Sequence, residues 1–291
     1  MKISELLAKN TPTLSLEVFP PKTSDSFCVV QKATEEIACL RPDFMSVTYG
    51  AGGSNAGFSL EIAKDLKAHG VTPLAHLTCV NSTKESIDER LDAFRAAGIE
   101  NIMALRGDMP KEPTLPPEWW AYCHANELMR AIKERGDFCI GGACYPETHP
   151  ESLSRKEDIA SLKRKVEDGC DFLTTQMFFD NTILFQFLYS LREAGVNVPV
   201  VAGIMPITNA AQMRRTLQIS GAGTYIPQRF KSLLDRFGTN PAAMMQAGIA
   251  YATDQIIDLY ANGINHVHVY TMNKPEVARR IMENVSVIIG K

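Results

Sequence analysis

The sequence predicts an α/β fold, a (β/α)8 TIM barrel, from two observations. Eight short apolar runs are spread through the 291 residues, and segments with apolar residues three and four apart lie between them. Buried parallel strands are near-continuous apolar runs, whereas amphipathic helices repeat with a period of about 3.6 residues. Eight such pairs within roughly 250 residues fit a closed barrel better than an open doubly wound sheet, so we predict a single domain over residues 1–291.

The predicted elements alternate along the whole chain. In order, the strands cover residues 13–19, 44–50, 72–79, 101–107, 138–145, 172–179, 198–205 and 266–271. The intervening helical segments include residues 86–98, SIDERLDAFRAAG, and residues 158–169, DIASLKRKVEDG. Both end at a glycine, as helices commonly do.

Two segments interrupt this alternation. Residues 109–120, MPKEPTLPPEWW, form a proline-rich loop after the fourth strand, and residues 224–263 add extra helices before the eighth strand. Both segments lie near strand ends, where barrel enzymes place the loops that build sites and lids.

Composition and charge argue against several classes of protein. The chain has 30 basic and 33 acidic residues without a basic block, which argues against a nucleic-acid partner. The first ten residues are too polar for a signal peptide, and no apolar run reaches the ~18 residues of a membrane span, so we expect a cytoplasmic protein with no membrane partner. Seven cysteines without a CxxC pair indicate reduced, mostly buried thiols, and Cys123 and His124 lack a spaced partner for a metal site, so we expect no metal.

Polar residues collect at the carboxyl ends of the predicted strands, where barrel enzymes hold their chemistry. These residues are Glu17, Thr48, Tyr49, His76, Thr78, Arg106, Asp108, Tyr145, His149, Gln176, Tyr270 and Thr271. Any one of these residues can have a purely structural role, but so many polar residues at the same end of the strands indicate a pocket.

Glu17 and Gly107 are the most informative of the strand-end residues. Glu17 lies among Leu16, Val18 and Phe19, so we expect apolar walls to keep its carboxyl group protonated, as a general acid requires. Gly107 separates two charged residues and allows the backbone to approach a flat ligand.

Known ligand-binding motifs narrow the chemistry. A GxGxxG after the first strand, a P-loop, a nucleophile elbow and an HExxH motif are all absent from the sequence. The basic run Lys163, Arg164 and Lys165 is either a solvated helix face or a site for a diphosphate, and composition does not decide between them.

Nine sequence blocks, taken together, resemble the methylenetetrahydrofolate reductase family over essentially the whole chain. They are LEVFPPKT, SVTYGAGG, AHLTC, ALRGD, CYPETHPES, LKRKVEDG, TTQMFFD, GIMPITN and HVYTMNK. The resemblance implies a (β/α)8 barrel that holds FAD. The flavin takes a hydride from a reduced nicotinamide, NAD(P)H, and passes it to 5,10-methylenetetrahydrofolate to give 5-methyltetrahydrofolate.

The resemblance also implies a role for each site residue. Glu17 is the general acid that protonates N10 and opens the ring to a 5-iminium cation, and Asp108 stabilises that cation and tunes the flavin. Gln176 contacts both the pterin and the nicotinamide, which occupy one flavin face in turn. Flavin contacts are implied for Thr48, Tyr49, Ala51, His76, Arg106, Gly107, Asp108, Ala125, Tyr145, His149, Ser152, Asp158, Ser161, Arg164 and Lys165. Substrate contacts are implied for Asp108, Gln176, Gln212, Tyr270 and Lys274.

On this resemblance the basic helix is functional, because Asp158 suits ribose hydroxyls while Arg164 and Lys165 suit the diphosphate. The departures from the family pattern concern the electron donor. Lys274 stands where members often have arginine, and Thr216 and Leu217 stand where an aromatic residue packs on the nicotinamide cofactor. NADH, NADPH and an electron-donating partner subunit all stay open as donors, and so does a homo-oligomer. From the length of 291 residues we expect no adenosylmethionine-sensing domain of the kind that eukaryotic members carry.

Three other enzyme or carrier classes compete with this interpretation. A proline dehydrogenase-like flavin barrel would need several cationic groups at the eighth strand, where only Lys274 is available. A zinc-dependent methyltransferase barrel would need a pair of adjacent cysteines at a strand end, and the sequence has no such pair. A flavin-carrying subunit that receives electrons from a partner would have no use for a buried acid such as Glu17.

Overall fold

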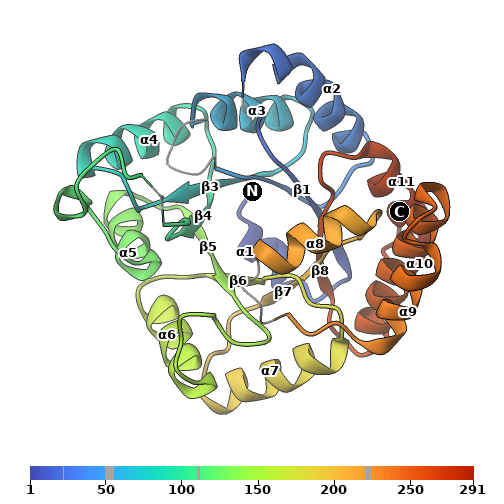
Figure 1. Ribbon diagram of the computed structural model, residues 1–291. Coiled ribbons are helices and arrows are strands. Elements are labelled where there is room, and N and C mark those ends of the chain that lie inside the picture. Colours follow the sequence, from blue (N-terminus) through green and yellow to red (C-terminus); the bar gives the residue numbers. More distant parts are fainter. Residues whose placement is uncertain (22, 50–55, 110–111, 220–223) are drawn as a thin grey trace.

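The computed structural model describes residues 1–21, 23–49, 56–109, 112–219 and 224–291, which form a closed barrel of eight parallel strands (Figure 1). The strands follow one another around the ring in chain order, and β1 pairs with β8 to close it. They are β1 (Thr13–Val18), β2 (Met45–Val47), β3 (Pro73–Thr78), β4 (Asn101–Leu105), β5 (Cys139–Cys144), β6 (Phe172–Thr175), β7 (Val200–Ile204) and β8 (His266–Tyr270). The predicted (β/α)8 fold is confirmed.

Helices surround the ring of strands in Figure 1. The outer helices are α2 (Phe27–Ala38), α3 (Ala56–Ala68), α4 (Lys84–Ala96), α5 (Ala125–Arg135), α6 (Arg155–Glu167), α7 (Asn181–Glu193), α9 (Gln228–Phe237), α10 (Pro241–Ala261) and α11 (Pro275–Val285), with short 3-10 turns at Ser24–Ser26 and Pro117–Trp119. A further helix, α8 (Ala210–Ile219), lies inside this ring (Figure 1). The main core lies between these helices and the outward side chains of the strands. Within the described ranges, every helix is too short or too polar to cross a membrane.

The observed strands are shorter than predicted, mainly at their carboxyl ends. The sixth was expected over residues 172–179, but β6 ends at Thr175 and its registered pairing with β7 stops at Thr174. Beyond that point the carbonyl oxygen of Thr175 accepts a hydrogen bond from the hydroxyl of Tyr270. Apolar character continues past the ladder because Phe178 packs in the main core and Phe179 packs on Phe230, and an apolar run in the sequence does not distinguish a strand from other buried chain.

The extra helices predicted before the eighth strand are confirmed as α9 and α10. A separate apolar cluster joins these helices to α8 and to the loop after β7, and it includes Phe179, Ile207, Met213, Phe230 and Met244. In Figure 1, α8 lies across the open end of the barrel, unlike the helices of the outer ring. This cluster therefore anchors a helix at the mouth of the barrel.

A short N-terminal helix, α1 (Ile3–Leu7), closes the opposite end of the barrel and was not predicted. Ile3 and Leu7 pack with residues near the strand starts, including Phe44 and Phe172. Asn101 connects the helix to the sheet, because its Oδ1 accepts the Ile3 N–H at 2.8 Å and its Nδ2 donates to the Met1 carbonyl at 3.1 Å. Five residues are too few to show a helical repeat, which explains the omission.

Replacing Asn101 with alanine should destabilise the fold by about 2 kcal/mol, because it leaves the buried N–H of Ile3 without its acceptor. Chemical denaturation followed by circular dichroism measures the change. Asn262→Ala is the matched control, since the side chain of Asn262 is exposed and only caps the end of α10. Equal denaturation midpoints for Asn101→Ala and the parent protein would contradict this account of α1.

Candidate active site

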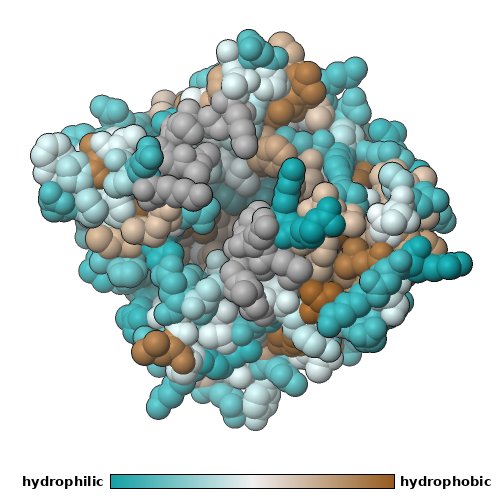
Figure 2. Space-filling model, in the orientation of Figure 1, coloured by the Kyte–Doolittle hydropathy of each residue, from teal (hydrophilic) through white to brown (hydrophobic). Residues whose placement is uncertain are grey.

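A large pocket opens at the carboxyl ends of the strands. Its volume is about 1150 Å3, and its walls include residues from all eight strands or from the loops that follow them. Figure 2 shows the same face of the molecule, hollowed near its centre. Helix α8 contributes to the wall through Gln212, Arg215 and Thr216. The pocket therefore lies where the chemistry of a (β/α)8 barrel is found.

Most of the predicted site residues line this one pocket. They are Glu17, Thr48, His76, Arg106, Gly107, Asp108, Ala125, Tyr145, His149, Ser152, Asp158, Ser161, Arg164, Lys165, Gln176, Gln212, Tyr270 and Lys274. Tyr49 does not line the pocket; the guanidinium of Arg90 lies over its ring, 5.8 Å from the ring centroid. Ala51 lies outside the described residues.

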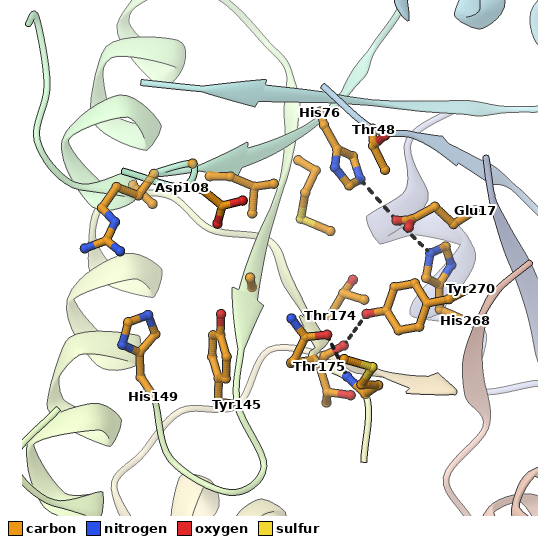
Figure 3. A pocket seen from close by; sticks show the side chains of 18 of the residues that line it. Glu17, Thr48, His76, Asp108, Tyr145, His149, Thr174, Thr175, His268 and Tyr270 are labelled. Atoms are coloured by element: carbon orange, nitrogen blue, oxygen red, sulfur yellow. Dashed lines mark hydrogen bonds and ion pairs between the residues drawn. The ribbon is translucent and has the colours of Figure 1, made fainter. Parts of the chain in front are cut away.

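Glu17 lies among polar side chains in the wall of the pocket, with a histidine on either side (Figure 3). Its Oε2 is 3.8 Å from Nε2 of His76 and 3.7 Å from Nε2 of His268. The hydroxyl of Ser46 donates to the same oxygen at 3.2 Å. On the other side of the imidazole, Nδ1 of His268 lies 2.7 Å from the hydroxyl of Ser15. The carboxyl group thus belongs to a chain of polar groups that continues into the barrel.

Among the residues that the structure describes, polar groups rather than the expected apolar walls contact the carboxyl group of Glu17. Side chains alternate along a strand, so Leu16 and Val18 pack in the outer core while Glu17 faces the interior. Burial raises the pKa of Glu17, but the contacts with His268, His76 and Ser46 together lower it by more, so the pKa lies below its usual value. Burial also lowers the pKa of His76 to about 4, so this ring is neutral at pH 7. The residues of this chain therefore hold Glu17 as a carboxylate rather than as the neutral acid that we expected.

His268 was missed at the sequence level, although a signal was present. Tyr270 was named at the end of strand eight, and His268 precedes it by two residues, so both side chains face the same side of the sheet. Thr271, which was also named, is buried outside the pocket, where its hydroxyl donates to the carbonyl of Glu17 at 2.6 Å. Strict alternation along the strand would have selected His268 and rejected Thr271.

The RGD sequence forms a second part of the pocket wall. Arg106 makes a two-pronged ion pair with Glu151, with N···O distances of 2.5 and 2.7 Å. Gly107 has a φ of +90°, and a β carbon at this position would lie 3.0 Å from Cβ of Thr78, so the turn favours glycine. Asp108 is exposed to the pocket. Thr78 itself is buried below this turn and does not line the pocket.

A third region combines an acid with two cations from α6. Asp158 is 4% exposed and accepts the main-chain N–H of His149 at 3.2 Å. Nζ of Lys165 donates to the carbonyl of Ala143 at 2.7 Å. Burial raises the pKa of Asp158 and lowers that of Lys165. Arg164 lines the pocket from the same helix, whereas Lys163, the first residue of the basic run, is exposed and does not.

Gln212 and Lys274 meet at Thr208, in the loop between β7 and α8. Oε1 of Gln212 accepts the main-chain N–H of Thr208 at 3.0 Å, and its Nε2 donates to the carbonyl of Pro206 at 3.0 Å. Nζ of Lys274 donates to the hydroxyl of Thr208 at 2.7 Å. These two predicted substrate contacts therefore also fix the position of the loop that leads into α8.

Comparisons with known proteins agree on one family. The methylenetetrahydrofolate reductase family model matches residues 2–286. Methylenetetrahydrofolate reductase (NADH) 1 of Arabidopsis thaliana is 35% identical over 302 residues, covering 99% of this chain and 50% of the relative. The 5,10-methylenetetrahydrofolate reductase of Escherichia coli is 31% identical over 278 residues, covering 95% of this chain and 92% of the relative.

This chain therefore spans about half the length of its plant relatives and nearly the full length of a bacterial one. Among solved structures, an uncharacterised protein from Clostridium thermocellum, described as binding two copies of 5-methyl-5,6,7,8-tetrahydrofolic acid, matches with a TM-score of 0.66. Its sequence is 15% identical and the match covers 100% of both chains, so this similarity supports the fold alone.

Proposed function

The chain belongs to the methylenetetrahydrofolate reductase family, and on that premise we propose that it reduces 5,10-methylenetetrahydrofolate to 5-methyltetrahydrofolate with bound FAD and NAD(P)H. The observation that carries the proposal is the placement of Glu17, a carboxyl group held between two histidines in a pocket of about 1150 Å3. Electron transfer alone needs no proton donor at this place. The relatives likewise do not favour a carrier subunit or a proline dehydrogenase-like barrel.

The residues that line the pocket fit a flavin dinucleotide. Among the described residues, His76 has a buried Nε2 with no hydrogen-bond partner, which a polar ligand atom can satisfy. The turn at Gly107 brings the backbone close to a flat ring, while Asp158 suits a ribose and Arg164 and Lys165 suit a diphosphate. When bound, the flavin would supply hydride transfer from the nicotinamide to the one-carbon unit of the folate.

Glu17 would donate a proton to N10 of the folate, which opens the ring to the 5-iminium cation. Because the residues of the chain hold it as a carboxylate, the proton has to be taken up as the complex forms. Burial already acts to raise the pKa of Glu17, and displacement of the remaining water by ligands strengthens this effect. Ser46 and His268 hold the carboxyl oxygen in place during this step.

Asp108 and Gln176 would act on the cation and on substrate binding. A carboxylate at the wall of the pocket stabilises positive charge as it develops on the substrate. Gln176 would contact the pterin and the nicotinamide in turn. Gln212, Tyr270 and Lys274 complete the proposed substrate contacts.

The donor is the least constrained part of the proposal. The plant relatives are named as NADH-dependent, which supports a reduced nicotinamide here. Lys274 supplies one positive charge at the mouth of the pocket, without the planar fork of an arginine. The cytoplasmic location, and a homo-oligomer or an electron-donating partner, stay predictions.

An anaerobic absorption experiment tests the proposed function. The purified protein should show a flavin spectrum that bleaches when NADH or NADPH is added and recovers when methylenetetrahydrofolate follows, with formation of 5-methyltetrahydrofolate. Bleaching by a reduced partner protein but by neither nicotinamide would reassign the donor. A reduced flavin that methylenetetrahydrofolate does not reoxidise would contradict the function itself.

A further inference from the structure

The hydroxyl of Tyr270 is bonded to the main chain of another strand. Tyr270 is the last residue of β8, and its Oη donates to the carbonyl of Thr175, the last residue of β6, at 2.6 Å. Strand β7 lies between these two strands, so the tyrosine ring crosses over it. Figure 3 shows Tyr270 beside Thr175. A β carbon on Gly203 of β7 would lie 2.6 Å from this Oη and 2.3 Å from the Thr175 carbonyl oxygen. Glycine is therefore required beneath the bond.

The Thr175 carbonyl is available for this bond because the β6–β7 ladder ends one residue earlier, at Thr174. Instead, the side-chain hydroxyl of Thr175 accepts the main-chain N–H of Gly203 at 2.8 Å. Thr175 is fully buried, so its carbonyl depends on protein partners. The end of β6 is thus attached to β7 by a side chain and to β8 by Tyr270.

This bond acts on the peptide plane that leads into Gln176. The C=O of Thr175 and the N–H of Gln176 belong to one rigid, planar unit. The hydroxyl of Tyr270 holds the oxygen of this unit, and the carbonyl of Cys144 in β5 accepts its N–H at 2.7 Å. Beyond the plane, Oε1 of Gln176 accepts the N–H of Met177 at 3.0 Å, and the side chain of Gln176 also contacts the hydroxyl of Tyr145 in the pocket wall. The direction in which the chain leaves the sheet at Gln176 is therefore fixed by two hydrogen bonds, one from Tyr270 in β8 and one to Cys144 in β5.

We propose that Tyr270 is a positioning residue for Gln176: its hydroxyl fixes the Thr175–Gln176 peptide plane and so aims the Gln176 amide at the substrate. The inference rests on the proposed function in so far as Gln176 contacts the folate. It changes the role of Tyr270, whose only hydroxyl proton is donated to Thr175 and which therefore acts through the main chain.

A double-mutant cycle tests whether the hydroxyl acts through Gln176. Tyr270→Phe keeps the ring over Gly203 and removes one hydrogen bond, so the KM for methylenetetrahydrofolate should rise about 3- to 10-fold with little change in kcat. In a Gln176→Ala background the same substitution should leave KM unchanged. An equal rise in both backgrounds would overturn the proposal, because the hydroxyl would then act independently of Gln176.

Tyr260→Phe is the matched control. The hydroxyl of Tyr260, in the last turn of α10, also donates to a main-chain carbonyl, that of Thr13 at the start of β1, at 2.9 Å. Tyr260 is buried and does not line the pocket. This variant should lose a buried hydrogen bond, and with it thermal stability, without a change in KM. A similar rise in KM in Tyr260→Phe would show that the effect is one of general stability and would overturn the proposal.

Hydrogen exchange provides a readout that does not depend on catalysis. The main-chain amide of Gln176 should exchange faster in Tyr270→Phe than in the parent protein, and at the parent rate in Tyr260→Phe. Unchanged exchange in Tyr270→Phe would overturn the positioning role. A parent protein that fails to reduce methylenetetrahydrofolate would instead contradict the proposed function, so the two failures are distinguishable.

Discussion

Replacing Glu17 with glutamine should reduce folate turnover by about 1000-fold while leaving reduction of the flavin by its donor near the parent rate. Glutamine has the same shape and can still accept the hydrogen bond from Ser46, but its amide protons are not acidic enough to be transferred to N10. Rapid-mixing measurements of the two half-reactions, each followed at the flavin absorption band, separate these effects.

The pH dependence of the folate half-reaction gives a second test of Glu17. Because the protonated form of Glu17 is the active one, the parent rate should fall as pH rises through the pKa that Glu17 has in the complex. Glu17→Gln should lose this dependence. The surroundings of Glu17 lower its pKa and so reduce the fraction of the protonated, active form. A substrate that excludes less water from the site raises the pKa less, so with such a substrate the rate should begin to fall at lower pH.

Glu100→Gln is the control for the Glu17 experiments. Glu100 is an exposed residue just before β4, where it pairs with the N-terminal ammonium, and it does not line the pocket. Its substitution should change neither half-reaction. Equal losses in both half-reactions of Glu17→Gln would argue against a general acid, because a proton donor for the folate has no part in flavin reduction.

The fold was predictable because a parallel barrel repeats one pattern eight times. Each strand is an apolar run and each outer helix has an apolar face, so local sequence is sufficient to identify them. Helix α1 was not predictable in this way, because its five residues are stabilised by packing of Ile3 and Leu7 on residues far away in the chain. Its anchor, Asn101, lies 98 residues beyond Ile3.

The sequence predicted which residues line the pocket better than it predicted the polarity of the surroundings of Glu17. A strand end indicates that Glu17 faces the pocket, but the two histidines beside it come from β3 and β8. Strand β8 reaches Glu17 only through closure of the ring, since Tyr270 pairs with Glu17 across the β1–β8 ladder. The residues next to Glu17 in the sequence are apolar and led to the prediction of an apolar environment. Its neighbours in the folded structure are polar.

Asp108 lies across the pocket from Glu17 and from the two histidines beside it, His76 and His268. Asp108 lies in the pocket wall formed by the turn after β4, while Glu17 lies toward β1 and β8 (Figure 3). Protonation by Glu17 creates positive charge on the folate, and a carboxylate facing that charge stabilises it more than it stabilises the neutral substrate. This side chain should therefore affect kcat more strongly than binding.

Asp108→Asn should slow the folate half-reaction by about 10- to 100-fold, below the full effect of a buried charge because Asp108 is exposed to solvent. Asparagine keeps the size of the side chain and removes only its charge, so flavin content should be unchanged. Asp137→Asn is the control, since Asp137 is an exposed acid paired with Lys2 and does not line the pocket. A folate half-reaction in Asp108→Asn as fast as in Asp137→Asn would mean that the cation is stabilised elsewhere, and that the RGD turn serves the pocket only through Arg106 and the close backbone approach at Gly107.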